Sequence, residues 1–119
     1  MRADDIQMNG PIKPAVITLT DAATIATDAS KGNHFRVTLG GNRTLGNPSN
    51  PTDGQRMIWE FLQDGTGNRT ITLDTKFSVP GNMAAVTLTT VANHWDMIGV
   101  IYNSSLDKFI VTGFMNDYV

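Results

Sequence analysis

The stretch His34-Phe35-Arg36-Val37-Thr38-Leu39 alternates between polar and apolar side chains. Because successive side chains of a β-strand point to opposite faces, this period of two predicts a strand with one face buried and one face in water. Residues 69–74 and 85–89 repeat the alternation, and residues 15–20 form an opening strand of the same kind. The chain is also rich in Thr, Val and Ile, which favour strands. The sequence therefore predicts an all-β fold.

Three further runs, residues 57–62, 97–102 and 109–114, are apolar at almost every position. A strand with two apolar faces needs a cover on both of them. In a two-layer domain the opposite sheet supplies one cover. Loops, the N-terminal segment or another subunit supply the other, and the sequence leaves these three alternatives open.

Turn signals rich in Gly, Pro and Asn separate these strands at short intervals. We expect residues 64–68 and 103–107 to form two hairpin loops. Residues 21–29 fit a short helix, but their β-branched residues favour a strand near 24–27 that forms a hairpin with the strand containing Phe35. Together these signals predict an antiparallel β-sandwich, or jelly-roll-like domain, over residues 15–119.

The first fourteen residues show no period and contain Pro11 and Pro14. Chain ends are usually frayed. The alternative, which we favour, is that residues 1–14 form an extended N-terminal arm that lies on a partner. The side chains expected to anchor this arm are Arg2, Ile6, Met8, Ile12 and Lys13.

Composition excludes several classes of protein. The 119 residues contain no cysteine, which removes disulfide scaffolds, thiolate zinc sites and cysteine nucleophiles. The net charge is −2 and the nine basic residues form no stripe, so we expect no nucleic-acid partner. The apolar runs are too short to span a membrane, and no apolar segment of the signal-peptide kind follows the first residues.

The polar residues show no catalytic or metal-binding pattern. His34 and His94 are the only histidines, and neither has a metal-ligand partner at a suitable spacing. Glu60 is a lone acid in an apolar strand, and we expect it to form an ion pair with Arg36 or Arg56, or to face outward. Residues 65–68 lack the lysine and the helix that a phosphate loop needs. We therefore expect no catalytic residue, no cofactor and no metal.

Aromatic residues divide between core and surface. Trp59 lies on the same side of its strand as other large apolar residues and is expected in the core, whereas Trp95 begins a strand beside a turn and is a candidate for an interface. Trp59, Trp95, Tyr102 and Tyr118 also suggest a sugar-stacking surface. For the interface between subunits we expect Trp95, Ile98, Val100, Phe114 and Tyr118.

A short internal echo links Asn42-Arg43-Thr44 to Asn68-Arg69-Thr70. The simpler interpretation is a turn sequence used twice. The alternative places Arg43 and Arg69 at equivalent ends of a sheet, where each forms a buried salt bridge.

Several motifs occur in a fixed order along most of the chain. They are residues 35–39, Gly41-Asn42-Arg43-Thr44-Leu45 with Asn47-Pro48, Asp53-Gly54-Gln55-Arg56, residues 63–72, residues 86–90 and Trp95-Asp96-Met97-Ile98. Together they resemble a small β-domain of tailed-phage virion proteins, of the kind seen in capsid decoration (head accessory) proteins and tail-fibre proteins. The resemblance implies a structural or adhesive virion component that is oligomeric and often trimeric, with no catalytic residues to transfer.

We therefore expect a capsid decoration or cement protein. It would be made in the bacterial host cytoplasm and would bind the major capsid protein on the outer surface of a phage head. A homotrimer of the β-domain, together with its arms, would stabilise the capsid by burying apolar area across neighbouring subunits. The alternative is a receptor- or glycan-binding module of a tail fibre or tail tip, in which residues 47–53 and 103–107 and exposed aromatic side chains would hold a host glycan.

Overall fold

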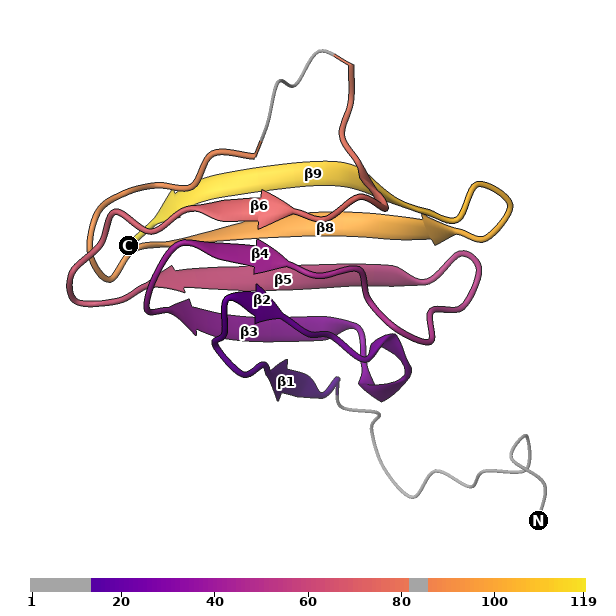
Figure 1. Ribbon diagram of the computed structural model, residues 1–119, viewed down its shortest axis with the longest axis horizontal. Coiled ribbons are helices and arrows are strands. Elements are labelled where there is room, and N and C mark those ends of the chain that lie inside the picture. The colour runs from indigo at the N-terminus through magenta and orange to yellow at the C-terminus, as the bar shows by residue number, and fades with distance from the viewer. Residues whose placement is uncertain (1–13, 82–85) are drawn as a thin grey trace.

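The computed structural model describes residues 14–81 and 86–119, and nearly all of its regular structure is β (Figure 1). A six-stranded sheet has the order β1-β3-β5-β8-β9-β7, and a three-stranded sheet has the order β2-β4-β6. Among the described residues, a single-turn 3₁₀ helix spans Ala29–Lys31. The all-β prediction is confirmed. The strands are β1 (Val16–Thr18), β2 (Thr24–Ile25), β3 (His34–Leu39), β4 (Arg43–Leu45), β5 (Arg56–Gln63), β6 (Ile71–Leu73), β7 (Phe77–Ser78), β8 (Trp95–Asn103) and β9 (Lys108–Tyr118).

The first six strands alternate between the two sheets, so the chain winds as a flattened coil with one strand in each sheet per turn (Figure 1). Each strand returns beside the strand two positions earlier and runs in the same direction. For this reason β1, β3 and β5 are parallel to one another, as are β2, β4 and β6. The pairs β5–β8 and β8–β9 are antiparallel. The expected antiparallel sandwich is therefore a mixed arrangement.

One of the two expected hairpins is present. Residues 103–107 connect the antiparallel strands β8 and β9, as predicted. Residues 64–68 instead carry the chain from β5 in the large sheet to β6 in the small one, so they are not a hairpin loop. Likewise β2 is a strand, as we favoured for this region, but it pairs with β4 and not with β3. Alternation identifies the buried face of a strand and leaves its neighbour undetermined, which explains both corrections.

The core lies between the sheets and contains a continuous row of aromatic rings. Trp59 stacks on Phe35 at a centroid distance of 5.4 Å and meets Phe77 edge-on at 5.8 Å. Phe77 contacts Phe109 at 5.4 Å, and Phe109 contacts Tyr102 at 4.7 Å. Such pairs stabilise a core beyond the area that they bury. The prediction that Trp59 belongs to the core is confirmed, because its side chain is fully buried.

In the segment predicted as a strand at residues 85–89, the described residues keep the alternation, with Val86 and Leu88 buried, but residues 86–90 form no strand and join neither sheet. Two buried side chains take the place of a neighbouring strand. The Gln63 amide donates to the Thr89 carbonyl at 2.7 Å, and the Asp96 carboxylate accepts from the Thr89 N–H at 2.7 Å. Gln63 also donates to the carbonyl of Arg69 at 2.8 Å and accepts from its N–H at 2.9 Å. Gln63 thus joins β5 to two segments that follow it.

Replacing Gln63 with Leu should strongly destabilise the fold, because the change leaves three backbone groups of Arg69 and Thr89 without partners. An unsatisfied buried polar group costs about 1–3 kcal/mol, so we expect the free energy of unfolding to fall by at least about 3 kcal/mol. Urea denaturation followed by circular dichroism measures the change. Thr72→Leu, on an exposed position of β6, is the control. A loss of less than about 1 kcal/mol for Gln63→Leu would contradict this account.

Candidate functional site

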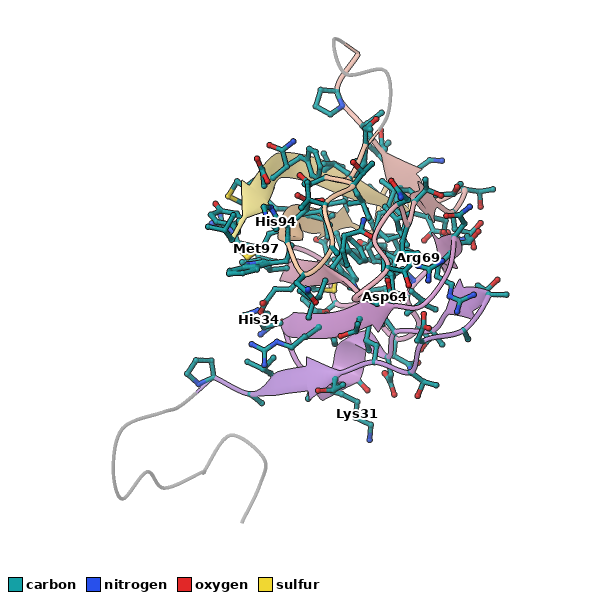
Figure 2. All side chains as sticks on the ribbon, turned by 90° about the vertical axis from the view of Figure 1, so that its left-hand side faces the viewer. Lys31, His34, Asp64, Arg69, His94 and Met97 are labelled. Carbon is teal, nitrogen blue, oxygen red and sulfur yellow. The ribbon has the colours of Figure 1, made fainter. Side chains whose placement is uncertain are left out.

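The large sheet has an outer face, which is the side turned away from the small sheet. In β3, β5 and β8 the alternation is regular, and every second residue points to this face. Figure 2 shows His34, Met97 and His94 along this side of the molecule, with Asp64 and Arg69 toward the other. The part of the outer face over β5, β8 and β9 is mainly apolar. Its large apolar residues are Ile58, Leu62, Trp95, Met97, Ile101, Ile110, Met115 and Tyr118.

Two glycines lie opposite each other in the middle of this apolar area. Gly99 on β8 pairs with Gly113 on β9, and a hollow of about 370 Å³ lies over them, bordered by Ile58, Ile101 and Met115. Neither glycine has a positive φ. A Cβ at Gly113 would meet nothing within 4 Å, and one at Gly99 would make ordinary van der Waals contacts. The backbone therefore does not require glycine here, and the missing side chains serve the shape of the outer face.

A second, smaller hollow lies on the outer face above the end of β5, and we call it the Trp95 trough. Its volume is about 250 Å³, and its lining residues are Arg36, Glu60, Leu62, Asn93 and Trp95. Leu62 pairs with Trp95 across β5 and β8, and Glu60 pairs with Arg36 across β5 and β3. The trough thus has an indole wall on one side and a guanidinium on the other.

Glu60 is the charged centre of this region. Its Oε2 contacts His34 Nε2 and accepts from Arg36 Nη2 at 3.3 Å. The expectation that Glu60 forms an ion pair with Arg36 is confirmed. The Arg36 side chain is half exposed, so this pair contributes little to stability. It instead fixes the orientation of the polar groups at the border of the apolar area.

The structure divides the residues predicted for the subunit interface. Trp95 and Tyr118 lie together on the outer face, where their rings stack at a centroid distance of 5.8 Å. Ile98 and Val100 point the other way and are 0% and 2% exposed within the core of this chain, and Phe114 also packs against that core. Placing Ile98 and Val100 on the surface was wrong, because β8 is apolar on both faces and its sequence does not tell which face is inside. The outward positions of β8 are Trp95, Met97, Gly99, Ile101 and Asn103.

The residues predicted to anchor an N-terminal arm, which are Arg2, Ile6, Met8, Ile12 and Lys13, lie outside the described residues. Pro14, which precedes β1, is the first described residue. The arm and its partner therefore remain predictions from the sequence.

The two loops proposed to hold a glycan lie at the same end of the molecule. The Ser104 N–H donates to Asp53 Oδ1 at 2.9 Å, which joins residues 47–53 to residues 103–107. An open hollow of about 750 Å³ lies nearby, lined by residues 29–33 and 52–56. No aromatic residue lines it, and the Gln55 amide within it already donates to Ala29, Gly32 and Asn33. This end is polar, but its central amide is occupied within the protein.

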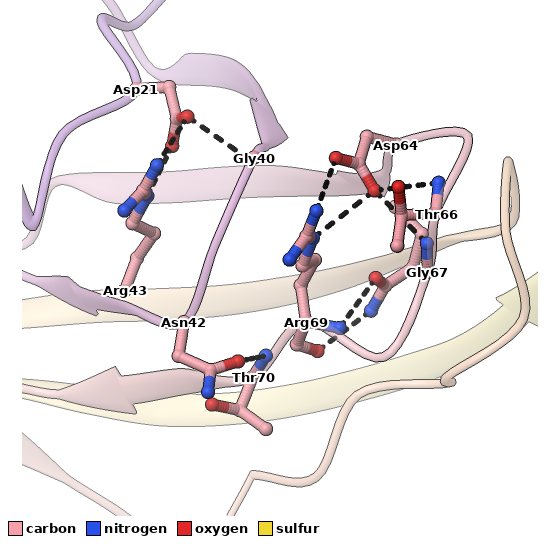
Figure 3. A network of polar contacts seen from close by, with 10 residues as sticks. Asp21, Gly40, Asn42, Arg43, Asp64, Thr66, Gly67, Arg69 and Thr70 are labelled. Atoms are coloured by element: carbon pink, nitrogen blue, oxygen red, sulfur yellow. Dashed lines mark hydrogen bonds and ion pairs between the residues drawn. The ribbon is translucent and has the colours of Figure 1, made fainter.

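The opposite end contains the two arginines of the internal echo. Figure 3 shows that each pairs with an aspartate: Arg43 Nε donates to Asp21 at 2.8 Å, and Arg69 Nη2 donates to Asp64 at 2.9 Å. The backbone N–H of Arg43 donates to the Thr70 carbonyl and Arg43 pairs with Ile71, so Arg69 lies two residues before β6 at the same end of the small sheet. All four side chains are about a quarter exposed. Both arginines thus form salt bridges at this end of the small sheet, as the second interpretation predicted, but the salt bridges are only partly buried and the two positions are not equivalent, because Arg69 lies outside β6.

The glycine-rich loop after β5 is closed by its own carboxylate. Asp64 Oδ1 accepts from the N–H groups of Thr66 at 3.1 Å and Gly67 at 3.0 Å (Figure 3). These are the donors that a phosphate loop would turn toward an anion. Gly67 has φ +76°, and a Cβ there would come within 2.6 Å of the Thr90 carbonyl. The loop is therefore a structural turn that joins the two sheets.

The second histidine also contacts a carboxylate. His94 Nδ1 lies 2.8 Å from Asp117 Oδ1, away from the contact between His34 and Glu60. Within residues 14–81 and 86–119, no three His, Asp or Glu side chains come together in a way that could hold a metal ion. In the same part of the chain, no helix is long and apolar enough to cross a membrane.

The fold and the outer face define a small mixed-sheet β-domain with an apolar surface. The model of the family described as "Putative phage tail fibre C-terminal domain" matches residues 20–105, which is more than half of the chain. The chain belongs to this family and is a structural protein of a phage, as its sequence indicates. No curated protein and no solved structure matches it.

The pair between Asp64 and Arg69 predicts a defined dependence of stability on pH. The hydrogen bond from Arg69, supported by those from Gly67 and Thr66, lowers the pKa of Asp64 from 3.8 to about 2. Because the folded state has the lower pKa, the stabilisation is complete above pH 3.8 and is lost as the pH falls through about 2. Asp64→Asn should therefore be less stable than the wild type at pH 7, and the difference should shrink below pH 3.8. Urea denaturation of both proteins across this range measures it, and a constant difference would contradict the assignment.

Proposed function

We propose that this chain is a terminal structural module of a phage tail fibre, and that identical copies pack against one another through the part of the outer face around Gly99 and Gly113. The observation that carries the proposal is the hollow over Gly99 and Gly113. The two glycines weaken their strands, since glycine in a strand has no side chain to pack and loses more entropy on folding. A partner that fills the hollow gives a reason for their presence.

The surroundings of the hollow suit such a partner. Ile58, on the central strand β5, and Met115, on β9, are 38% and 39% exposed. Contiguous exposed apolar surface of this kind commonly marks a site of interaction with another molecule. Arg56 is the charged residue that lines the hollow, whereas Glu60 and Arg36 lie outside it and form an ion pair. A homotrimer is the stoichiometry that the resemblance to phage virion domains implies.

The family description favours the tail over the head. Capsid decoration, which the sequence analysis favoured, would make use of the same apolar face against the major capsid protein. The arm that should distinguish the two roles lies outside the described residues. The position of the chain on the particle therefore decides between them.

Gly113→Glu should turn the assembled protein into a monomer, because it places a charge in the hollow at the centre of the proposed interface. The monomer fold should tolerate the change, since nothing lies within 4 Å of a Cβ at this position. Sedimentation velocity at micromolar concentration measures the association. Gly113→Ala is the matched control and should keep most of it. A wild-type protein that is monomeric under these conditions would overturn the proposal, as would equal association of Gly113→Glu.

Labelling of phage particles provides the test of location. Gold-conjugated antibodies against the chain should mark the far ends of tail fibres and leave heads unmarked. Electron microscopy of intact particles reads the result, and particles from a phage lacking the chain are the control. Gold over the head surface would instead support capsid decoration and would reject the tail-fibre role.

A further inference from the structure

The Trp95 trough combines one aromatic wall with a small set of polar groups. Tyr118 stacks on Trp95 from the β9 side at 5.8 Å, whereas the trough lies over β5, on the opposite side of β8. The second face of the indole therefore borders the trough, and the stacked tyrosine holds it in place. An aromatic face held in this way can receive an apolar ring face without first losing rotamer entropy.

The polar groups of the trough suit hydroxyl groups. Both contacts of Glu60 within the described residues use Oε2, which leaves Oε1 as an acceptor, and Arg36 uses one of its donors at 3.3 Å. Asn93 lies in the turn before β8 with φ +64°, which asparagine tolerates, and its side chain offers both a donor and an acceptor. Each hydroxyl of a polyol both donates and accepts, so donors and acceptors side by side can bind adjacent hydroxyls.

The charge and the size of the trough narrow the class of ligand. Glu60 offsets the charge of Arg36, so the trough favours a neutral polyol over an anion. Its volume of about 250 Å³ is below the roughly 300–1,000 Å³ typical of drug-sized sites and suits a single sugar ring. Leu62 forms an apolar floor beneath such a ring.

We propose that the Trp95 trough binds one pyranose ring of a neutral saccharide, with a C–H face of the ring on the indole and its hydroxyls on Glu60, Arg36 and Asn93. The inference deepens the proposed function, on which its biological role rests, by naming what a fibre end would hold on a host surface. One ring gives a Kd on the order of 1 mM, since small ligands gain a limited free energy for each atom. Several copies in one fibre raise the overall affinity by avidity.

Nuclear magnetic resonance of the two indole N–H groups tests the inference directly. Trp59 donates its indole N–H to Thr27 Oγ1 at 3.1 Å inside the core and serves as an internal control, whereas Trp95 borders the trough. Methyl glycosides of glucose, galactose, mannose and N-acetylglucosamine are titrated to well above the expected Kd. We expect at least one of them to shift the Trp95 signal with saturation and to leave the Trp59 signal unchanged. Methyl glucuronide and adenosine, titrated in the same way, represent anionic sugars and nucleosides.

Two arginine variants locate the site. Arg36→Gln removes a donor from the trough and should weaken the binding about tenfold, which is the usual effect of losing a hydrogen bond to a charged group. Arg56→Gln is the matched control, because Arg56 is also exposed on the outer face but does not line the trough. Trp95→Leu should abolish the binding while the melting temperature stays close to that of the wild type.

The inference is overturned if no neutral glycoside shifts the Trp95 signal, if the two arginine variants bind equally, or if adenosine or methyl glucuronide binds more tightly than every neutral glycoside. Its failure is distinguishable from failure of the proposed assembly, because the titrations are repeated on Gly113→Glu. If Gly113→Glu no longer associates but gives the same glycoside titration curves as the wild type, both proposals are supported. If the wild type associates but no glycoside shifts its Trp95 signal, only the saccharide site is rejected.

Discussion

The buried amide of Gln63 is the interaction on which the two-sheet arrangement depends. The small sheet has three strands and the large sheet six, so the small sheet cannot cover the whole inner face of the large one. Residues 86–90 complete this cover with Val86 and Leu88, but no ladder satisfies their backbone. Gln63 and the buried Asp96 provide the missing partners for Thr89. Because buried backbone groups must be paired, these two polar side chains make an unpaired segment acceptable as part of the core.

The sequence predicts the strands of this fold much better than their pairing. Alternation located β3 and the central Trp59 correctly, because burial of one face leaves a period of two. Alternation does not show whether two strands pair in parallel. β3 and β5 are parallel because the chain passes through β4 of the small sheet between them. The hairpin at residues 103–107 was predictable because it joins strands that are adjacent both in sequence and in space.

The candidate site was partly predictable for a related reason. Trp95 and Tyr118 were identified as surface aromatics, whereas Ile98 and Val100 were placed on the wrong side of a strand that is apolar on both faces. Only the register across β5, β8 and β9 shows which side faces outward. The pairing of Gly99 with Gly113 was also beyond sequence analysis, because the two residues become neighbours only through that register. A glycine inside each of two apolar strands is the sequence signal that could have drawn attention to this pair.

The winding of the first six strands has a consequence for how such chains can diversify. Each turn of the coil adds one strand to the large sheet and one to the small sheet. Duplication or deletion of a whole turn would therefore widen or narrow both layers together, without inverting the inside and outside of any other strand. The antiparallel pair β8–β9, which carries the glycine hollow, lies beyond the last of these turns. Adding or removing turns before β5 would thus change the breadth of the domain and leave the pairing of Gly99 with Gly113 as it is.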